Sequence, residues 1–136
     1  MSLKQEKLEW IDTHAHLDHA YPFSLEEYLT NAKKIGVSKL ITIGTTPDTL
    51  TKLSEISHQY PSVYFTVGIH PHDAKLFSNS VEEQMDKLRK DHKCVAVGEI
   101  GLDYHYQHSP QDVQRKVFEQ QLKLARLWKL PVVIHA

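Results

Sequence analysis

The chain has 136 residues, of which 40% are apolar and 24% are charged, a composition typical of one globular domain and not of a disordered or fibrous segment. Its 16 basic and 17 acidic residues nearly cancel, so no overall basic field predicts binding to nucleic acid or to an anionic membrane. A single cysteine, Cys94, excludes an internal disulfide, and no apolar run suggests a signal peptide or a membrane span, so we expect a cytoplasmic protein.

Short runs rich in valine and isoleucine alternate with longer amphipathic segments. Five of these runs predict strands, at 8–12, 39–44, 63–69, 94–101 and 131–136. The runs are continuously apolar, with no polar residue at every second position. This pattern is typical of parallel strands that are covered on both faces.

Four helices are predicted between the strands from their start signals. In chain order these signals are the capping box of Ser24 and Glu27, Thr46 with Pro47, the capping box of Ser80 and Glu83, and Ser109 with Pro110. The apolar spacing of the last helix predicts a buried face that includes Val117, Leu122 and Ala125.

Alternating strands and helices fit two architectures, an open doubly wound sheet or a (β/α)8 barrel. A barrel needs about 250 residues, so length alone favours the open sheet. The residues that carry chemistry must decide between the two.

Two histidines follow the first predicted strand, in the segment WIDTHAHLD at 10–18. His14 and His16 are separated by one residue, and residues i and i+2 of an extended strand point to the same face about 6 to 7 Å apart. Two imidazoles at that spacing can chelate an ion, but a closed metal site needs further ligands. A histidine beside a strand is otherwise usually a surface or hydrogen-bonded residue.

Glu99 and His135 lie at the C-terminal ends of later predicted strands, where active sites form in parallel α/β folds. Glu99 lies within the apolar run VAVGEIGLDY, and an unpaired buried carboxylate is strongly unfavourable. It must therefore be protonated, paired with a cation or bound to a metal. His135 ends the run PVVIHA and is either a hydrogen-bonded core histidine or a ligand.

The segment HPHD at 70–73 also carries two histidines, but its proline indicates a loop, so the strand spacing does not apply. We therefore expect His70 and His72 to contact substrate or to hold metal ligands in place, in preference to binding a metal. His105 and His108 lie in the polar segment HYQHSPQD, which predicts exposure to solvent.

Four motifs resemble the signatures of the TatD-type metal-dependent hydrolases, deoxyribonucleases of the amidohydrolase-like TIM-barrel superfamily. They are DTHAHLD at 12–18, VGIHPHDA at 67–74, GEIGLDY at 98–104 and PVVIHA at 131–136. The resemblance covers the whole chain and is specific, because four motifs rarely coincide in the right order. It implies a (β/α)8 TIM barrel, of which residues 1–136 hold five strands and four helices as the N-terminal half of one domain.

The resemblance also implies what individual residues do. His14 and His16 bind one divalent ion, Glu99 is the catalytic residue that bridges two ions, and His135 binds the second. The ions implied are Zn, Mg, Mn or similar. The substrate implied is DNA or another phosphoester.

The implied reaction is metal-assisted hydrolysis without a nucleophilic side chain. Asp12 and Asp103 are candidates to orient the imidazoles by accepting their free N–H groups. The family places a further histidine and a further aspartate after later strands, so we expect the chain to be part of a longer polypeptide or to associate with a partner that supplies the rest. Three functions stay open: a TatD-like nuclease, a related amidohydrolase acting on a small amide, lactone or phosphoester, and a non-catalytic half-barrel.

Overall fold

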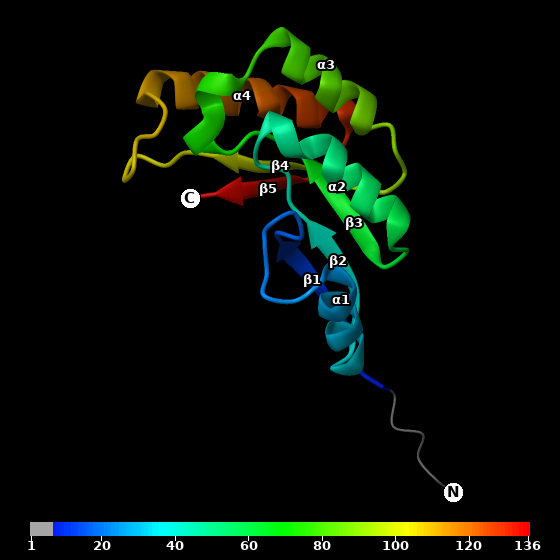
Figure 1. Cartoon of the computed structure of the whole chain (residues 1–136). Helices are drawn as coiled ribbons and strands as arrows, with labels where there is room; N and C mark the ends of the chain where they lie inside the picture. Colours follow the sequence, from blue (N-terminus) through cyan, green and yellow to red (C-terminus); the bar gives the residue numbers. More distant parts are fainter. Residues whose placement is uncertain (1–6) are drawn as a thin grey trace, which may run out of the picture.

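The computed structural model describes residues 7–136, in which five strands form one sheet with helices between them (Figure 1). The strands are β1 (Trp10–Ala15), β2 (Val37–Thr42), β3 (Val63–Val67), β4 (Cys94–Gly101) and β5 (Val132–His135). The helices are α1 (Leu25–Lys34), α2 (Pro47–Gln59), the 3-10 helix η1 (Pro71–Leu76), α3 (Asn79–Leu88) and α4 (Gln111–Trp128). The five strands and four α-helices expected from the sequence are confirmed, and η1 is an addition.

The strands pair in chain order, β1-β2-β3-β4-β5, and every neighbouring pair is parallel. A doubly wound sheet reverses its strand order at a switch point. The expectation from length alone, an open doubly wound sheet, is therefore wrong. A consecutive order with a helix after each strand is the arrangement of a (β/α)8 barrel, and these strands form about half of one.

The sheet is strongly curved. In a flat sheet β1 and β4 would lie three strand spacings, about 14 Å, apart, and side chains standing upright on it would not meet. Yet Nε2 of His14 in β1 lies 3.5 Å from Oε2 of Glu99 in β4. The sheet therefore curls around its inward-facing side chains, which brings distant strands to one site.

The main core lies between the central strands and the helices that cover them (Figure 1). Phe65 and Val67 of β3 are fully buried against Met85 of α3 and other apolar side chains. Cys94 is buried at the start of β4, and this burial raises the pKa of its thiol to about 12. It packs as a small apolar residue and is poorly suited to act as a nucleophile.

The edge strands are less covered than the central ones. Trp10 of β1 is 60% exposed and Ile134 of β5 is 47% exposed, whereas β4 is buried along most of its length. Coverage of both faces, expected for all five strands, therefore holds for the centre of the sheet and is wrong for its edges. Each edge strand has a neighbouring strand on one side only among the described residues.

Two helix starts test the predicted capping boxes. The box of Ser24 and Glu27 is confirmed at α1, with both reciprocal hydrogen bonds present. The box of Ser80 and Glu83 is wrong: α3 begins after Ser78, whose Oγ accepts the N–H of Val81. The hydroxyl of Ser80 lies instead 2.9 Å from that of Ser78, inside the first turn.

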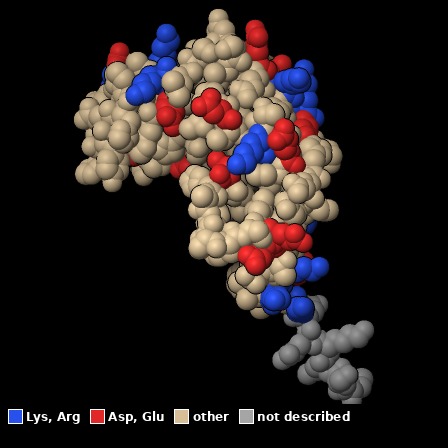
Figure 2. All heavy atoms as spheres, in the orientation of Figure 1, with Lys and Arg blue, Asp and Glu red and all other residues tan. Residues whose placement is uncertain are grey.

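Acidic and basic side chains are interspersed over the face seen in Figure 2, in keeping with a formal net charge of -1. Within residues 7–136, no helix combines the length and the apolar character that a bilayer crossing requires.

Candidate metal centre

The residues singled out from the sequence converge at the C-terminal end of the sheet. Glu99 lies at their centre, with a side chain only 9% exposed. Its Oε1 lies 2.9 Å from Nδ1 of His135 in β5, and its Oε2 lies 3.5 Å from Nε2 of His14 in β1. The two oxygens of one carboxylate thus face histidines from opposite edges of the sheet.

Two groups of potential ligand atoms share Glu99. His14, His16 and Glu99 offer atoms that all lie within 4.8 Å of one another, and so do His70, Glu99 and His135. Imidazole nitrogens and carboxylate oxygens are the usual ligands of Zn²⁺ and similar ions. A carboxylate between two such groups has the position that a bridging ligand requires.

The donor atoms themselves fit a bound cation. Oε1 of Glu99 and Nδ1 of His135 lie 2.9 Å apart, and two electron-pair donors that close require a proton or a cation between them. Nδ1 of His16 is buried and has no hydrogen-bond partner within the described structure, which is rare for a polar atom. Burial and the neighbouring His19 and His14 lower the pKa of His16, which leaves its ring neutral and able to ligate.

His70 lies close enough to Glu99 and His135 to be a metal ligand, but its hydrogen bonds indicate a different role. It caps η1, where its Nδ1 accepts the N–H of His72 at 3.1 Å, and burial lowers the pKa of His70 to about 4. A neutral ring that accepts at Nδ1 carries its proton on Nε2. That N–H points to Nδ1 of His135, 3.2 Å away, so His70 presents a donor to the centre.

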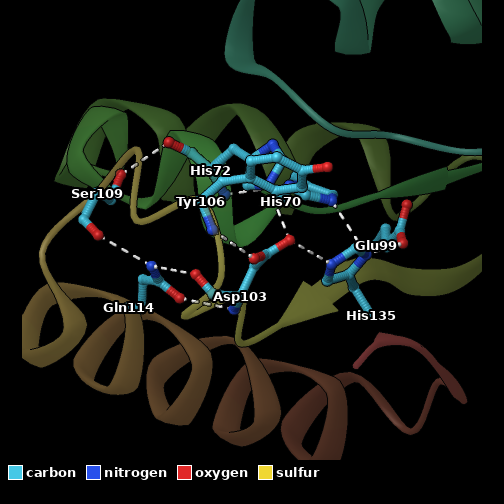
Figure 3. A network of polar contacts seen from close by, with 8 residues as sticks. All are labelled: His70, His72, Glu99, Asp103, Tyr106, Ser109, Gln114 and His135. Carbon is cyan, nitrogen blue, oxygen red and sulfur yellow. Dashed lines mark hydrogen bonds and ion pairs between the residues drawn. The ribbon is translucent and has the colours of Figure 1, made fainter.

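Asp103 holds two imidazoles in place (Figure 3). Its Oδ2 accepts from Nε2 of His72 and from Nε2 of His135, both at 2.9 Å. Burial opposes the charged form of Asp103, but the hydrogen bonds from His135 and His72 outweigh it and lower the pKa of the carboxyl. Because Nε2 of His135 is taken up by Asp103, Nδ1 is left to face Glu99.

Buried polar side chains to which the sequence gave no role support this network. Gln114 of α4 accepts the N–H of Asp103 at 2.8 Å and donates to its carbonyl at 3.0 Å. Gln121 clamps Ile69, before η1, in the same two-way manner. The sequence could have indicated them only through their position on α4, where both lie on the buried face of the helix. Leu122, which was expected on that face, is 39% exposed, so that expectation is wrong.

The remaining candidates lie near the centre with other contacts. Asp12 accepts the backbone N–H of His14 at 3.0 Å, so it fixes the main chain there and contacts no imidazole among the described residues. His105 and His108 are exposed, as expected. Asp18, whose Oδ1 is buried without a hydrogen-bond partner among residues 7–136, forms a third group with His16 and His19, with ligand atoms within 4.8 Å of one another.

Comparison with known proteins identifies the family. A family model described as TatD related DNase matches residues 11–136. The chain belongs to the TatD-related DNase family. This finding confirms the resemblance that the four sequence motifs carried, and with it the barrel type that their order implied.

Relatives in the TatD family are similar over most of this chain. The uncharacterized metal-dependent hydrolase YabD of Bacillus subtilis is 38% identical over 91% of this chain and 49% of its own length. The 3'-5' ssDNA/RNA exonuclease TatD of Cronobacter sakazakii is 31% identical over 90% of this chain and 45% of its own. The crystal structure of the TatD homologue YJJV from Escherichia coli is 35% identical, with a TM-score of 0.83 over 93% of this chain and 50% of that one. The chain thus spans about half the length of these relatives.

In this TatD-family chain, Asp103→Asn is expected to lower the affinity for Zn²⁺ about 10- to 100-fold, because one amide oxygen cannot replace a charged carboxylate that accepts from two imidazoles. Isothermal titration calorimetry on the metal-free chain measures the change. Asp112→Asn, which removes an exposed carboxylate from the first turn of α4, is the control and should bind as the unmodified chain does. Equal affinity in both variants would rule out the orienting role of Asp103.

Proposed function

We propose that the polypeptide that carries these residues is a divalent-metal-dependent hydrolase of phosphodiester bonds, a TatD-type deoxyribonuclease. The observation that carries the proposal is the meeting of two groups of nitrogen and oxygen donors at one buried carboxylate, Glu99. The nuclease named among the relatives supports nucleic acid as the substrate class.

In this proposal His14 and His16 would hold one ion, His135 would hold a second, and Glu99 would be the ligand common to both. Ions held there would supply Lewis acidity, which activates water and offsets the charge that develops on a phosphoryl group. Asp103 keeps the proton on Nε2 of His135, so that Nδ1 stays free to ligate.

The Nε2–H of His70 is then available to a substrate. It lies next to His135, and it is the donor that the ring presents to the centre once Nδ1 has accepted from His72. A phosphate oxygen that faces the ions still has lone pairs that can accept a hydrogen bond. A neutral N–H donor beside the ions would supply that bond. This agrees with the expectation that His70 contacts substrate in preference to binding metal.

We further propose that residues 1–136 form the first half of one TIM-barrel domain, and that further ligands come from a second half. Five strands in barrel order, with uncovered edges at β1 and β5, support this. Chain length and the coverage of about half of each relative agree with it.

The test is a nuclease assay on the 136-residue chain and on any longer polypeptide in which it occurs. Each protein is freed of metal with EDTA, and single-stranded DNA labelled at one end is added with and without Mn²⁺ or Zn²⁺. The expected result for the longer polypeptide is release of nucleotides from a DNA end that requires added ion and is stopped by EDTA, whereas the 136-residue chain alone, without the ligands proposed for the second half, is expected to release none. Turnover of a small amide, lactone or phosphoester without release of nucleotides would indicate the related amidohydrolase. Metal binding by the longer polypeptide with no turnover of any of these substrates would indicate a non-catalytic half-barrel.

A further inference from the structure

A pair of parallel rings stands at the edge of the metal centre. Tyr106 is 63% exposed, and its ring lies 5.8 Å from that of His108 with an angle of 10° between the planes. We call these two residues the Tyr106–His108 stack. An aromatic side chain this exposed contributes little to the core, so the folded state gives no reason for its position.

The stack is held in place by contacts on both sides. Oδ1 of Asp103 accepts the N–H of Tyr106 at 3.3 Å, and Nζ of Lys75 donates to the carbonyl of His108 at 3.0 Å. Gln107, which lies between these two residues in the sequence, has a φ of 48°, a left-handed conformation that non-glycine residues adopt infrequently. A backbone in such a conformation persists only where the surroundings impose it, and such positions cluster at functional sites.

The stack is in contact with the metal centre through one ring. His72 lies edge-on to Tyr106, with ring centroids 5.6 Å apart, and its ring is 6.0 Å from that of His135 (Figure 3). The ring of His72 also lies edge-on to that of His108, at 4.6 Å. The same Asp103 that anchors Tyr106 also holds His72 and His135. The backbone that carries the exposed ring thus has a fixed position relative to the donor atoms, and the ring itself lies against His72.

We propose that the Tyr106–His108 stack is a base-binding subsite, on which a nucleobase at the end of a single strand stacks while the adjoining phosphate lies at Glu99 and His135. This inference rests on the proposed function and specifies that the protein binds the terminal nucleobase of the substrate. Stacking on an exposed aromatic ring accepts any base, because every base has a π-face. Bases inside a duplex already stack on one another, so the subsite selects single strands or frayed ends.

The near-zero net charge of the chain is in keeping with binding through the bases. A groove that holds the nucleic-acid backbone by charge needs an excess of lysine and arginine, whereas this chain has 16 basic and 17 acidic residues. These residues therefore offer no overall basic field, and local contacts with the bases are a source of affinity that does not need one. Tyr106 offers the exposed π-face that such a contact needs.

The first experiment measures binding of a fluorescein-labelled single-stranded oligonucleotide by anisotropy, with Mn²⁺ present and with phosphorothioate linkages in the strand so that it is not digested. Tyr106→Ala is expected to weaken binding about 5- to 150-fold, the loss of one stacked base. Tyr106→Phe keeps the ring and should bind as the unmodified chain does. His92→Ala is the matched control, because it removes a ring that is even more exposed, beside the start of β4 at the opposite end of the sheet.

A second measurement separates stacking from a structural effect. The fluorescence of 2-aminopurine, placed at the 3' end of one oligonucleotide and at the 5' end of another, is quenched when the base stacks. We expect quenching at one of the two ends by the unmodified chain and by Tyr106→Phe, and none by Tyr106→Ala. An oligonucleotide that lacks that terminal base should bind the unmodified chain and Tyr106→Ala equally.

The outcomes keep the subsite and the proposed function apart. Unchanged affinity and quenching in Tyr106→Ala, or no binding of the single strand by the unmodified chain, would overturn the subsite. If metal-dependent release of nucleotides then still occurs, the nuclease proposal stands without it. If binding depends on Tyr106 but the longer polypeptide releases no nucleotide, the subsite stands and the nuclease proposal fails.

Discussion

Glu99→Gln is expected to remove the shared ligand of both donor groups and with it most of the divalent-metal binding and the nuclease activity. Oε1 faces His135 and Oε2 faces His14, so one substitution takes a negative charge from both sides of the centre. The loss of zinc affinity should exceed the factor of about 10 to 100 that the loss of an orienting partner produces. Turnover should fall at least as far, because activation of water depends on the ions.

The same substitution should change the stability of the metal-free chain little. Glutamine has nearly the volume of glutamate, and removing a carboxylate that is only 9% exposed also removes its cost of desolvation. Calorimetric titration with Zn²⁺ and thermal unfolding in EDTA measure the two quantities. Glu83→Gln, which neutralises an exposed carboxylate in α3, is the control. Unchanged zinc stoichiometry and affinity in Glu99→Gln would exclude Glu99 as the bridging ligand.

The sequence located much of this centre because parallel strands impose a simple rule. Carboxyl ends of neighbouring strands meet at one edge of the sheet, so polar residues that end apolar runs lie together. His14, Glu99 and His135 follow that rule. It requires only that the strands are recognised, and the five apolar runs sufficed for that.

What the sequence could not give depends on details of local backbone geometry and on contacts between segments far apart in the chain. The part that His70 plays follows from a local detail, the capping of η1, which fixes the proton on Nε2. Gln114 and Gln121 looked like ordinary residues of an amphipathic helix, and their function depends on which backbone groups lie opposite. The Tyr106–His108 stack requires the turn at Gln107, which no sequence pattern signals.

Length alone favours the wrong architecture for a similar reason. A sheet of five parallel strands is a natural size for an open fold, and nothing in the apolar runs specifies strand order or curvature. Curvature is visible in one contact, between β1 and β4 across three strand spacings. The four motifs carried that information indirectly, through the family that they resemble.

Gly101→Ala is expected to give the largest loss of stability among single substitutions near the centre. Gly101 ends β4 with a φ of 152° and pairs with His135 of β5. A Cβ added there would lie 2.0 Å from the carbonyl oxygen of His135, a distance at which one backbone must move. Such overlap in a packed region costs about 3 kcal/mol of unfolding free energy.

Movement of β5 would also disrupt the candidate metal centre, because the residue displaced is itself a proposed ligand. The carbonyl that clashes belongs to His135, whose ring lies 2.9 Å from both Glu99 and Asp103. Gly101→Ala should therefore lower zinc affinity together with the free energy of unfolding, measured by urea titration and calorimetry.

Gly36→Ala is the matched control: its φ is 96°, and the nearest atom to an added Cβ, the carbonyl oxygen of Leu8, is 3.3 Å away. It should cost about 1 to 2 kcal/mol for the left-handed backbone and leave zinc affinity unchanged, because it lies before β2, at the end of the sheet away from the centre. If the two variants lose equal stability, or if Gly101→Ala binds zinc normally, close approach of β4 to β5 is not what sets His135 in place.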